Sequence, residues 1–247
     1  MTKCPRYIGY DALLTRIRTL AADRVIVAVA GPPGAGKSTL SAALAVALSI
    51  DHPGRAEVIP MDGFHYDDAV LDARGLRGRK GSPPTFDVAG FRHLLDRLKA
   101  HDEAEVAIPV FDRSLEISRA GARIVPALAR ILIAEGNYLL LRDPPWADLC
   151  AIFDLTVMIH EPRQLLEQRL LSRWQSFGFD EAAAHAKVYD NDLPNVDLVL
   201  ARSIRADIIV SCAPVADVGP AHGVDAREMY RDGINEPLFK AARNYLE

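Results

Sequence analysis

The sequence predicts one α/β domain with a mostly parallel sheet flanked by helices. Strand-length apolar runs alternate with helical patterns along most of the chain, and parallel strands need such helical crossovers. The hydrophobic content of 49% and the charged content of 25% are typical of a globular protein with a sizeable core. With 247 residues, the chain is long enough for one large domain or two small ones, and one domain is the simplest interpretation.

The N-terminal half begins with alternating helices and strands. Apolar residues on one helical face predict a helix at residues 11–22, and the run RVIVAVA predicts a buried strand at 24–30. A helix rich in Ala and Leu follows at 37–49 and is expected in the core because it is apolar nearly all round. A short strand follows at 57–60. Residues 61–90 are dense in Gly, Pro, Asp and Arg and predict a long loop, of a length that is usually functional or disordered.

The rest of the domain continues this alternation. Gly178 is expected to separate two helices, and Asn195 lies near the start of a helix that follows a break at residues 190–192. The predicted helices are residues 91–100, 163–177, 180–191 and 196–203, and the predicted strands are residues 106–111, 129–134, 151–160 and 207–210.

The pattern weakens after Ser211. Residues 212–227 contain two prolines and two glycines without a clear period and predict a loop or tail, while residues 236–246 predict a terminal helix. We therefore expect one domain at residues 1–210 and a C-terminal extension of unassigned role at 211–247.

Residues 31–38, GPPGAGKS, fit the motif G-x-x-x-x-G-K-[ST] between a buried strand and a helix. Glycines allow the backbone angles that turn successive N–H groups toward phosphate oxygens, and the helix N-terminus adds the positive end of its dipole. Lys37 is expected to reach the outer phosphates, and the Ser38 hydroxyl to ligate Mg²⁺. The sequence therefore predicts a P-loop NTPase fold that binds a nucleoside triphosphate with Mg²⁺. The predicted nucleotide-binding residues are Gly31, Gly34, Ala35, Gly36, Lys37, Ser38 and Thr39.

Two acidic residues at predicted strand ends favour a kinase. Asp62 follows the strand at 57–60, beside the expected γ-phosphate, where a carboxylate can accept a proton from an attacking hydroxyl. Glu135 ends the strand ILIA, where many P-loop proteins have an Asp that holds Mg²⁺. The chain has no N-K-x-D guanine motif, which argues against a GTPase. A capping or strand-ending carboxylate is the alternative interpretation of each acid.

The order of these motifs resembles the phosphoribulokinase/uridine kinase superfamily. After the phosphate loop come DGFH at 62–65, RKGSPPTFD at 79–87, IPVFDR at 108–113 and EG at 135–136. The Lys-Gly-x-Pro segment is similar to that of the pantothenate kinase-like branch, and much the same string occurs in fructose transport system kinases. The likeness covers roughly residues 24–210. Uridine kinases have Asp-Ser-Phe-Tyr in place of DGFH, which argues against uridine as the substrate.

This resemblance implies an ATP-dependent kinase that transfers the γ-phosphoryl group to a hydroxyl of a small metabolite. It implies that Asp62 is the general base, that Glu135 lies near Mg²⁺, and that a helical lid at about residues 163–192 carries functional arginines. The predicted catalytic residues are Lys37, Asp62, Arg169 and Arg173, the predicted metal ligands are Ser38 and Glu135, and the predicted acceptor-binding residues are His65, Lys80, Asp87 and Arg113. Solvated surface arginines and an ordinary loop histidine are the competing explanations for the lid residues and for His65.

Composition narrows the class of partner. The net charge of −4 argues against general binding to nucleic acids or anionic membranes. The scattered Cys4, Cys150 and Cys212 favour reduced thiols over disulfides or a zinc site. The sequence shows no secretion signal and no apolar run of membrane-spanning length. We therefore expect a cytoplasmic protein with a small-molecule substrate and no nucleic-acid or membrane partner. Its oligomeric state stays open, with a homodimer as one alternative.

Two other functions stay open at this stage. A nucleotide-dependent regulator or transport accessory protein with slow hydrolysis would use the same phosphate loop, and the long loop and the C-terminal extension are compatible with it. An enzyme that acts on nucleic acid is a weaker alternative, because the chain is acidic overall. The sequence leaves the acceptor and the adenine-reading residues unassigned.

Overall fold

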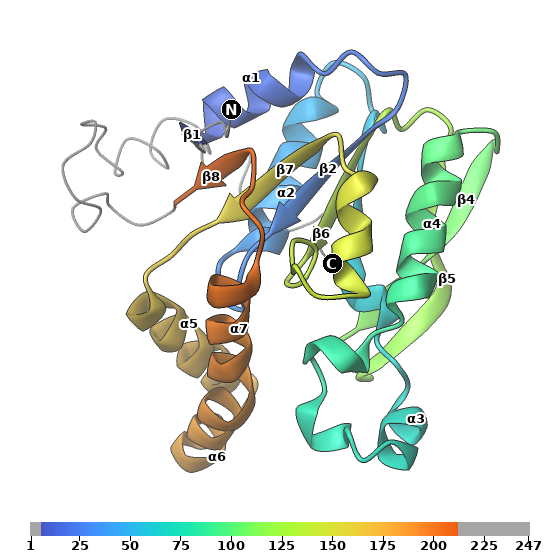
Figure 1. Cartoon of the computed structure of the whole chain (residues 1–247). Helices are drawn as coiled ribbons and strands as arrows, with labels where there is room; N and C mark the ends of the chain where they lie inside the picture. The colour runs from blue at the N-terminus through green and yellow to red at the C-terminus, as the bar shows by residue number, and fades with distance from the viewer. Residues whose placement is uncertain (1–5, 212–247) are drawn as a thin grey trace.

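A six-stranded parallel sheet forms the centre of the computed structural model, which describes residues 6–211 (Figure 1). Its strands lie in the order β1–β8–β7–β2–β6–β3, and every neighbouring pair runs parallel. This arrangement confirms the predicted α/β fold with a mostly parallel sheet. The strands are β1 (Arg6–Tyr7), β2 (Val25–Ala30), β3 (Ala56–Pro60), β6 (Ile131–Gly136), β7 (Leu155–Ile159) and β8 (Ile208–Val210).

Helices cover both faces of the sheet (Figure 1). Because strand side chains alternate between the faces, odd-numbered residues of β2 pack in one apolar core with α1 (Tyr10–Arg18) and α2 (Lys37–Leu48). Even-numbered residues of β2 pack in a second core with α4 (Val88–Ala100) and the 3₁₀ helix η4 (Trp146–Ala151). The predicted strand at 151–160 is shorter than expected, since η4 occupies the residues before it and buries Trp146.

An antiparallel hairpin stands beside the main sheet. Its strands are β4 (Glu105–Asp112) and β5 (Ile117–Pro126). The strand predicted at 106–111 is confirmed as β4, but β5 had no counterpart among the predicted elements. Most side chains of β5 are exposed or half-buried, so its residues lack the apolar alternation by which strands are recognised.

Residues 61–90 are not one long loop, which corrects the prediction. Four short helices order this part of the chain, and α4 already begins at Val88. Asp67 caps the second of them by accepting a hydrogen bond of 2.9 Å from the Ala69 N–H. The four helices are η1 (Met61–Phe64), α3 (Asp68–Ala73), η2 (Arg77–Arg79) and η3 (Pro83–Thr85). Residues 61–87 are called the 61–87 segment below.

Three helices form an arm that extends beyond the end of the sheet (Figure 1). They are α5 (Arg163–Ser176), α6 (Glu181–Lys187) and α7 (Leu193–Arg202), and we call residues 163–202 the α5–α7 arm. A π-helical turn, η5 (Val188–Asp192), joins α6 to α7 without leaving helical geometry. The predicted helix break at residues 190–192 is therefore wrong.

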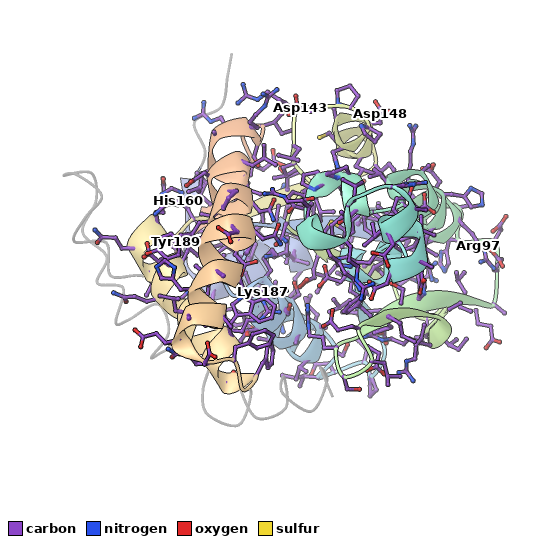
Figure 2. All side chains as sticks on the ribbon, turned by 90° about the horizontal axis from the view of Figure 1, so that it is seen from below. Arg97, Asp143, Asp148, His160, Lys187 and Tyr189 are labelled. Carbon is purple, nitrogen blue, oxygen red and sulfur yellow. The ribbon has the colours of Figure 1, made fainter. Side chains whose placement is uncertain are left out.

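The α5–α7 arm contacts the 61–87 segment. Arg79 Nη1 donates a hydrogen bond of 3.0 Å to the carbonyl oxygen of Asp190, and Asn191 Nδ2 donates one of 2.9 Å to the carbonyl oxygen of Lys80. The two hydrogen bonds thus connect segments that are 111 positions apart in the sequence. Figure 2, which looks at the molecule from below, shows the arm with Lys187 and Tyr189 on the opposite side of the molecule from Arg97.

Two sequence predictions concern the end of the chain. The tail at 212–227 and the helix at 236–246 lie outside the described residues. Within residues 6–211, no helix combines the length and the apolar character that crossing a membrane requires.

Candidate active site

The phosphate loop connects β2 to α2 through residues 31–36. Gly34 and Gly36 have φ angles of 80° and 90°, a left-handed conformation that glycine adopts without strain. A Cβ atom at Gly31 would lie 3.1 Å from the carbonyl oxygen of Ile159, so glycine also permits the close approach of β7. The first amide groups of α2 have no acceptor within their own helix, and Ser38 and Thr39 lie in that first turn. This geometry suits an anion such as a triphosphate.

Lys37 is buried at the start of α2. Only 8% of it is exposed, and its Nζ donates a hydrogen bond of 3.0 Å to the carbonyl oxygen of Pro32. Burial lowers the pKa of the ammonium group, while the carboxylates of Glu135 and Asp62 oppose that change. Lys37 is therefore a desolvated cation between two acids, able to interact strongly with a phosphate.

Glu135 and Ser38 supply oxygen atoms beside the phosphate loop. Glu135 lies on β6, where it is in register with Val29 of β2, and only 6% of it is exposed. The Ser38 hydroxyl donates a hydrogen bond to the carboxylate, but Oε2 is buried and finds no hydrogen-bond partner among residues 6–211. Burial raises the pKa of Glu135, against the effect of Lys37. A buried, unpartnered carboxylate oxygen is the kind of ligand that Mg²⁺ prefers.

The protein residues alone do not complete a metal site. Within the described part of the chain, no cluster of three or more His, Cys, Asp or Glu side chains is arranged to hold a metal. A hard cation at Glu135 and Ser38 would take its remaining oxygen ligands from water and phosphates, as Mg²⁺ commonly does in nucleotide sites. The residues present therefore fit Mg²⁺ bound together with a nucleotide.

Asp62 lies at the carboxyl end of β3 and is paired with Arg113. Its Oδ2 is 2.6 Å from Nη2 of Arg113, which comes from the turn between β4 and β5. Burial acts to raise the pKa of Asp62, but Arg113, His65 and Lys37 together hold it below the ordinary value. Asp62 is therefore ionised at neutral pH and available as a proton acceptor.

A cleft of about 630 Å³ separates the α5–α7 arm from the 61–87 segment and the hairpin. It brings together four of the predicted catalytic and acceptor-binding residues from the segment and the hairpin, and one from the arm. They are Asp62, His65, Lys80, Arg113 and Arg173.

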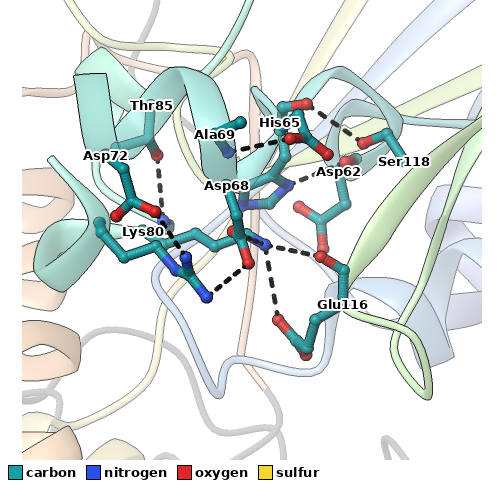
Figure 3. Close-up of polar contacts among 12 residues, drawn as sticks. Asp62, His65, Asp68, Ala69, Asp72, Lys80, Thr85, Glu116 and Ser118 are labelled. Atoms are coloured by element: carbon teal, nitrogen blue, oxygen red, sulfur yellow. Dashed lines mark hydrogen bonds and ion pairs between the residues drawn. The ribbon is translucent and has the colours of Figure 1, made fainter. Parts of the chain in front are cut away.

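Lys80 is held at the cleft by acidic and carbonyl partners (Figure 3). Its Nζ lies 2.7 Å from Oδ1 of Asp68 and 2.7 Å from the carbonyl oxygen of Glu116. Arg77 pairs with Asp68 and Asp72 at 2.8 and 2.9 Å. Lys80 and Arg77 are thus both paired with acidic neighbours in the same segment.

Asp87 caps a helix and lies outside the cleft. Its Oδ1 accepts a hydrogen bond of 2.9 Å from the Gly90 N–H, which caps the N-terminus of α4. Because the carboxylate is engaged at this cap and Asp87 is absent from the cleft lining, we do not retain it as an acceptor-binding residue.

The two predicted arginines of α5 have different surroundings. Arg173 lines the cleft and forms no ion pair within the described chain, and its guanidinium stands over the ring of Phe177. Arg169 lies behind the phosphate loop instead, where it donates a hydrogen bond of 3.3 Å to the Gly34 carbonyl and lies 3.7 Å from the buried Glu161 carboxylate. Arg173 is thus placed to contact a ligand, and Arg169 to brace the loop.

Several cleft residues escaped the sequence analysis. Asn137 follows Glu135 and Gly136 at the end of β6, so the strand-end argument would have found it. Asn191 and Asn195 share one face of the π turn and α7, but the predicted helix break obscured their four-residue spacing. The aromatic residues Trp174, Phe177 and Phe179 also line the cleft.

The chain is similar to proteins named as kinases. No family model matches it. It is 34% identical over 218 residues to the candidate uridine kinase C227.14 of Schizosaccharomyces pombe, a match that covers 83% of this chain and 92% of the relative. It is 30% identical over 232 residues to the pantothenate kinase of Sorangium cellulosum, with 83% and 72% covered.

A solved structure supports the same similarity. The candidate fructose transport system kinase of Silicibacter sp. TM1040 is 43% identical, with a TM-score of 0.76 and coverage of 82% of this chain and 98% of its own. All three matches cover at least 72% of both chains, so they concern the domain as a whole and not a single motif.

Proposed function

Since the chain belongs to the phosphoribulokinase/uridine kinase superfamily of P-loop kinases, in its pantothenate kinase-like branch, we propose that ATP is its phosphoryl donor and Asp62 its general base. The chain is a small-molecule phosphotransferase, and the acceptor under this proposal is a hydroxyl of a small metabolite. The observation that carries the proposal is the ionised Asp62 carboxylate, which lines the cleft and interacts electrostatically with Lys37 of the phosphate loop.

In the proposed reaction, Asp62 accepts the proton of the acceptor hydroxyl. The oxygen then forms a bond to the γ-phosphorus, the bond from that phosphorus to the β–γ bridging oxygen breaks, and ADP leaves with the electron pair. Lys37 and Arg173 stabilise the negative charge on the transferring group, because Lys37 is a buried cation of the phosphate loop and Arg173 is a half-buried cation that lines the cleft. Arg113 keeps Asp62 ionised and oriented until the acceptor binds.

Ser38 and Glu135 are the residues that would hold Mg²⁺ in this proposal. The ion, when bound, neutralises phosphate charge and helps to align the triphosphate. The unpartnered Oε2 of Glu135 supports the assignment. ATP and Mg²⁺ are both plentiful in the cytoplasm, which is where we propose that the enzyme acts.

Phosphoryl transfer by purified full-length protein tests this function. The assay uses labelled ATP and Mg²⁺ with a panel of sugars, nucleosides, pantothenate and glycerate, and it compares transfer with hydrolysis by water. We expect Asp62→Asn to bind ATP with a Kd within about threefold of the wild type, and to lose about 10²- to 10⁴-fold in transfer, the range for a general base.

Asp87→Asn is the matched control for that substitution. It makes the same chemical change in the same segment, and asparagine is also a good N-cap, so transfer should stay unchanged. Near-normal transfer by Asp62→Asn would refute the base assignment. If no hydroxyl compound outpaces water as an acceptor, the kinase proposal fails and a nucleotide-dependent regulator becomes the better explanation.

A further inference from the structure

Lys80 joins three separate parts of the molecule (Figure 3). Its Nζ lies 2.7 Å from Oδ1 of Asp68 on α3 and 2.7 Å from the carbonyl oxygen of Glu116 in the turn between β4 and β5. Its own carbonyl oxygen accepts the hydrogen bond of 2.9 Å from Asn191 of the α5–α7 arm. The contacts of this one residue therefore connect the 61–87 segment to the hairpin and to the arm.

The backbone beside Lys80 is itself held in place. The hydroxyl of the buried Tyr138 donates a hydrogen bond of 2.5 Å to the carbonyl oxygen of Gly81, and the Gly81 N–H donates one of 3.0 Å to Oγ1 of Thr85. The Lys80 side chain is only 17% exposed, and its Nζ lies 5.2 Å from the centroid of the Phe111 ring. A lysine that is fixed at its backbone and along its side chain can hold the groups that its ammonium contacts.

The turn between β4 and β5 contains a residue that needs such support. Glu116 has a φ angle of 56°, a left-handed conformation that is unfavourable for any residue with a side chain. Such conformations persist where the surrounding structure holds them. At the start of the turn, Asp112 Oδ1 accepts hydrogen bonds from the N–H groups of Ser114 and Leu115 at 3.0 and 3.2 Å. Lys80 supplies a contact at the other end, on the carbonyl oxygen of Glu116.

The same turn carries Arg113, the partner of Asp62. Half of the Arg113 side chain is exposed, so packing restricts it little and its position depends on the backbone of the turn. Its guanidinium lies 5.7 Å from the centroid of the Phe111 ring that Lys80 also contacts. If the turn moved, the guanidinium would leave Asp62, and the attraction between the two charges would fall with distance.

We propose that Lys80 is a positioning residue for the proposed phosphoryl transfer, which holds the turn between β4 and β5 so that Arg113 stays paired with Asp62. This inference rests on the proposed kinase function. It replaces the acceptor-binding role that the sequence predicts for Lys80. An ammonium group has three N–H donors, and Asp68 and the Glu116 carbonyl engage two of them, with Oε2 of Glu116 a further 3.8 Å away.

The charges around Asp62 decide how the inference can be tested. Burial raises the pKa of Asp62, and Glu135 is a carboxylate close enough to interact with it. The cations that lower this pKa are, in order of effect, Arg113, His65, Lys37 and Arg173. The pKa of Asp62 therefore reports whether Arg113 is in place, and it can be measured without any substrate.

The first test is an NMR titration of the Asp62 carboxyl group in the ligand-free, full-length protein, with the signal assigned by Asp62→Asn. Lys80→Met keeps an unbranched side chain but removes the ammonium donors. We expect it to raise the pKa of Asp62 by about half a pH unit or more, because Arg113 is no longer held against the carboxylate. The acid limb of kcat/KM should move to higher pH by the same amount.

A double-variant cycle shows whether Lys80 acts through Arg113. In the Arg113→Gln background, Lys80→Met should change the pKa of Asp62 by less than about 0.2, because the pairing that Lys80 maintains is already absent. An effect of equal size in both backgrounds would mean that the lysine acts by its own charge, which overturns the inference.

Lys99→Met is the matched control. Lys99 Nζ also donates to a main-chain oxygen, that of Ile152, and pairs with Asp154, but Lys99 lies outside the cleft lining. Its substitution should leave the titration of Asp62 unchanged.

Hydrogen–deuterium exchange reports on the turn itself. Amides at residues 113–117 should exchange about threefold faster or more in Lys80→Met and at the wild-type rate in Lys99→Met. Asp68→Asn removes the carboxylate partner of Lys80 and should raise the exchange rate and the pKa of Asp62 by smaller amounts. If Lys80→Met does not fold, Asp68→Asn decides the question, and wild-type values of both quantities would overturn the inference.

The outcomes separate the inference from the function on which it rests. If Lys80→Met raises the KM for the acceptor and leaves the pKa of Asp62 unchanged, Lys80 binds the acceptor, so the inference fails while the kinase function stands. If no hydroxyl compound accepts the phosphoryl group, the kinase function fails. The titration of the ligand-free protein then still decides whether Lys80 holds Arg113 on Asp62.

Discussion

Nη2 of Arg113 lies 2.6 Å from Oδ2 of Asp62, although the two residues are 51 positions apart in the sequence. The hairpin that carries Arg113 thereby controls the ionisation of Asp62, which lies just after the end of β3. Burial alone would raise the pKa of Asp62 above its ordinary value of 3.8, and the arginine is the largest of the effects that bring it below.

Arg113→Gln should move the acid limb of the rate profile to higher pH. Without the guanidinium, burial raises the pKa of Asp62, so the base becomes protonated at a pH where the wild-type carboxylate is still charged. We expect the acid limb of kcat/KM to shift upward by about one pH unit or more. Arg119→Gln, in the same hairpin but paired with Asp112, should leave the limb unchanged. An unchanged limb in Arg113→Gln would contradict the assignment of Asp62.

Glu135→Gln should separate metal binding from stability. Burial raises the pKa of Glu135 above 4.5 in the ligand-free protein, so the protonated form stabilises the fold at low pH and that stability is lost as pH rises through the raised value. Glutamine imitates the protonated form. At pH 8 the ligand-free variant should therefore melt at the wild-type temperature or above it.

The same variant should respond poorly to the metal. We expect the Mg²⁺ concentration for half-maximal rate to rise by about 10- to 100-fold, and ATP with Mg²⁺ to raise the melting temperature much less than in the wild type. The exposed Glu105→Gln on β4 is the control. A normal Mg²⁺ response together with a lower melting temperature would show a structural role only.

Alanine substitutions should distinguish the two arginines of α5. Arg173→Ala removes a cation that faces the cleft, so kcat should fall by about 10²- to 10³-fold while the Kd for ATP changes little. Arg169→Ala releases the Gly34 carbonyl and leaves the buried Glu161 without this cation. It should weaken ATP binding about tenfold and lower the free energy of unfolding by about 1–3 kcal/mol. Titration calorimetry measures the Kd for ATP, steady-state kinetics measure kcat, and thermal unfolding measures the stability. If Arg169→Ala lowered kcat and Arg173→Ala weakened ATP binding instead, the roles assigned to the two arginines would have to be exchanged.

Gly63→Ser should damage the site through the hairpin. A Cβ atom at Gly63 would lie only 2.4 Å from the carbonyl oxygen of Pro109 on β4, so the strand must move away. We expect a loss of about 1–3 kcal/mol in unfolding free energy and a lower kcat, because Arg113 moves with β4. Gly78→Ala, with open space around its added methyl group, is the control. Wild-type stability of Gly63→Ser would contradict the close packing of β4 on η1.

The phosphate loop and the strand-end acids could be predicted because local patterns determine them. A glycine-rich turn between a buried strand and a helix commonly binds phosphate groups. The carboxyl ends of parallel strands meet at one edge of the sheet, so acids at these ends lie near one another. Lys37, Asp62 and Glu135 were found in this way, and the structure brings them close enough to perturb one another's pKa. Their chemical roles stay predictions until the variants are measured.

Other features depend on tertiary contacts that leave no local signal. The strand β5 is mostly exposed, so no apolar period marks it. The π turn keeps the chain helical through Asp192, where sequence signals indicated an end, and it places Asn191 and Asn195 at the cleft. Asp87 belongs to a family-like string, yet its carboxylate is engaged by the N-terminus of α4. The motif therefore identified the right segment, but the role of the Asp87 side chain depends on the helix cap that it forms.

The bonds from Arg79 to the Asp190 carbonyl and from Asn191 to the Lys80 carbonyl have a practical meaning for protein engineering. Each bond joins a side chain of one segment to a main-chain oxygen of the other, between the 61–87 segment and the α5–α7 arm. The backbone of each segment is therefore held in part by a side chain of the other. If residues 74–87 alone were replaced by those of a relative with another acceptor, these two bonds would be lost. A functional chimera needs residues 74–87 and residues 188–195 from the same parent.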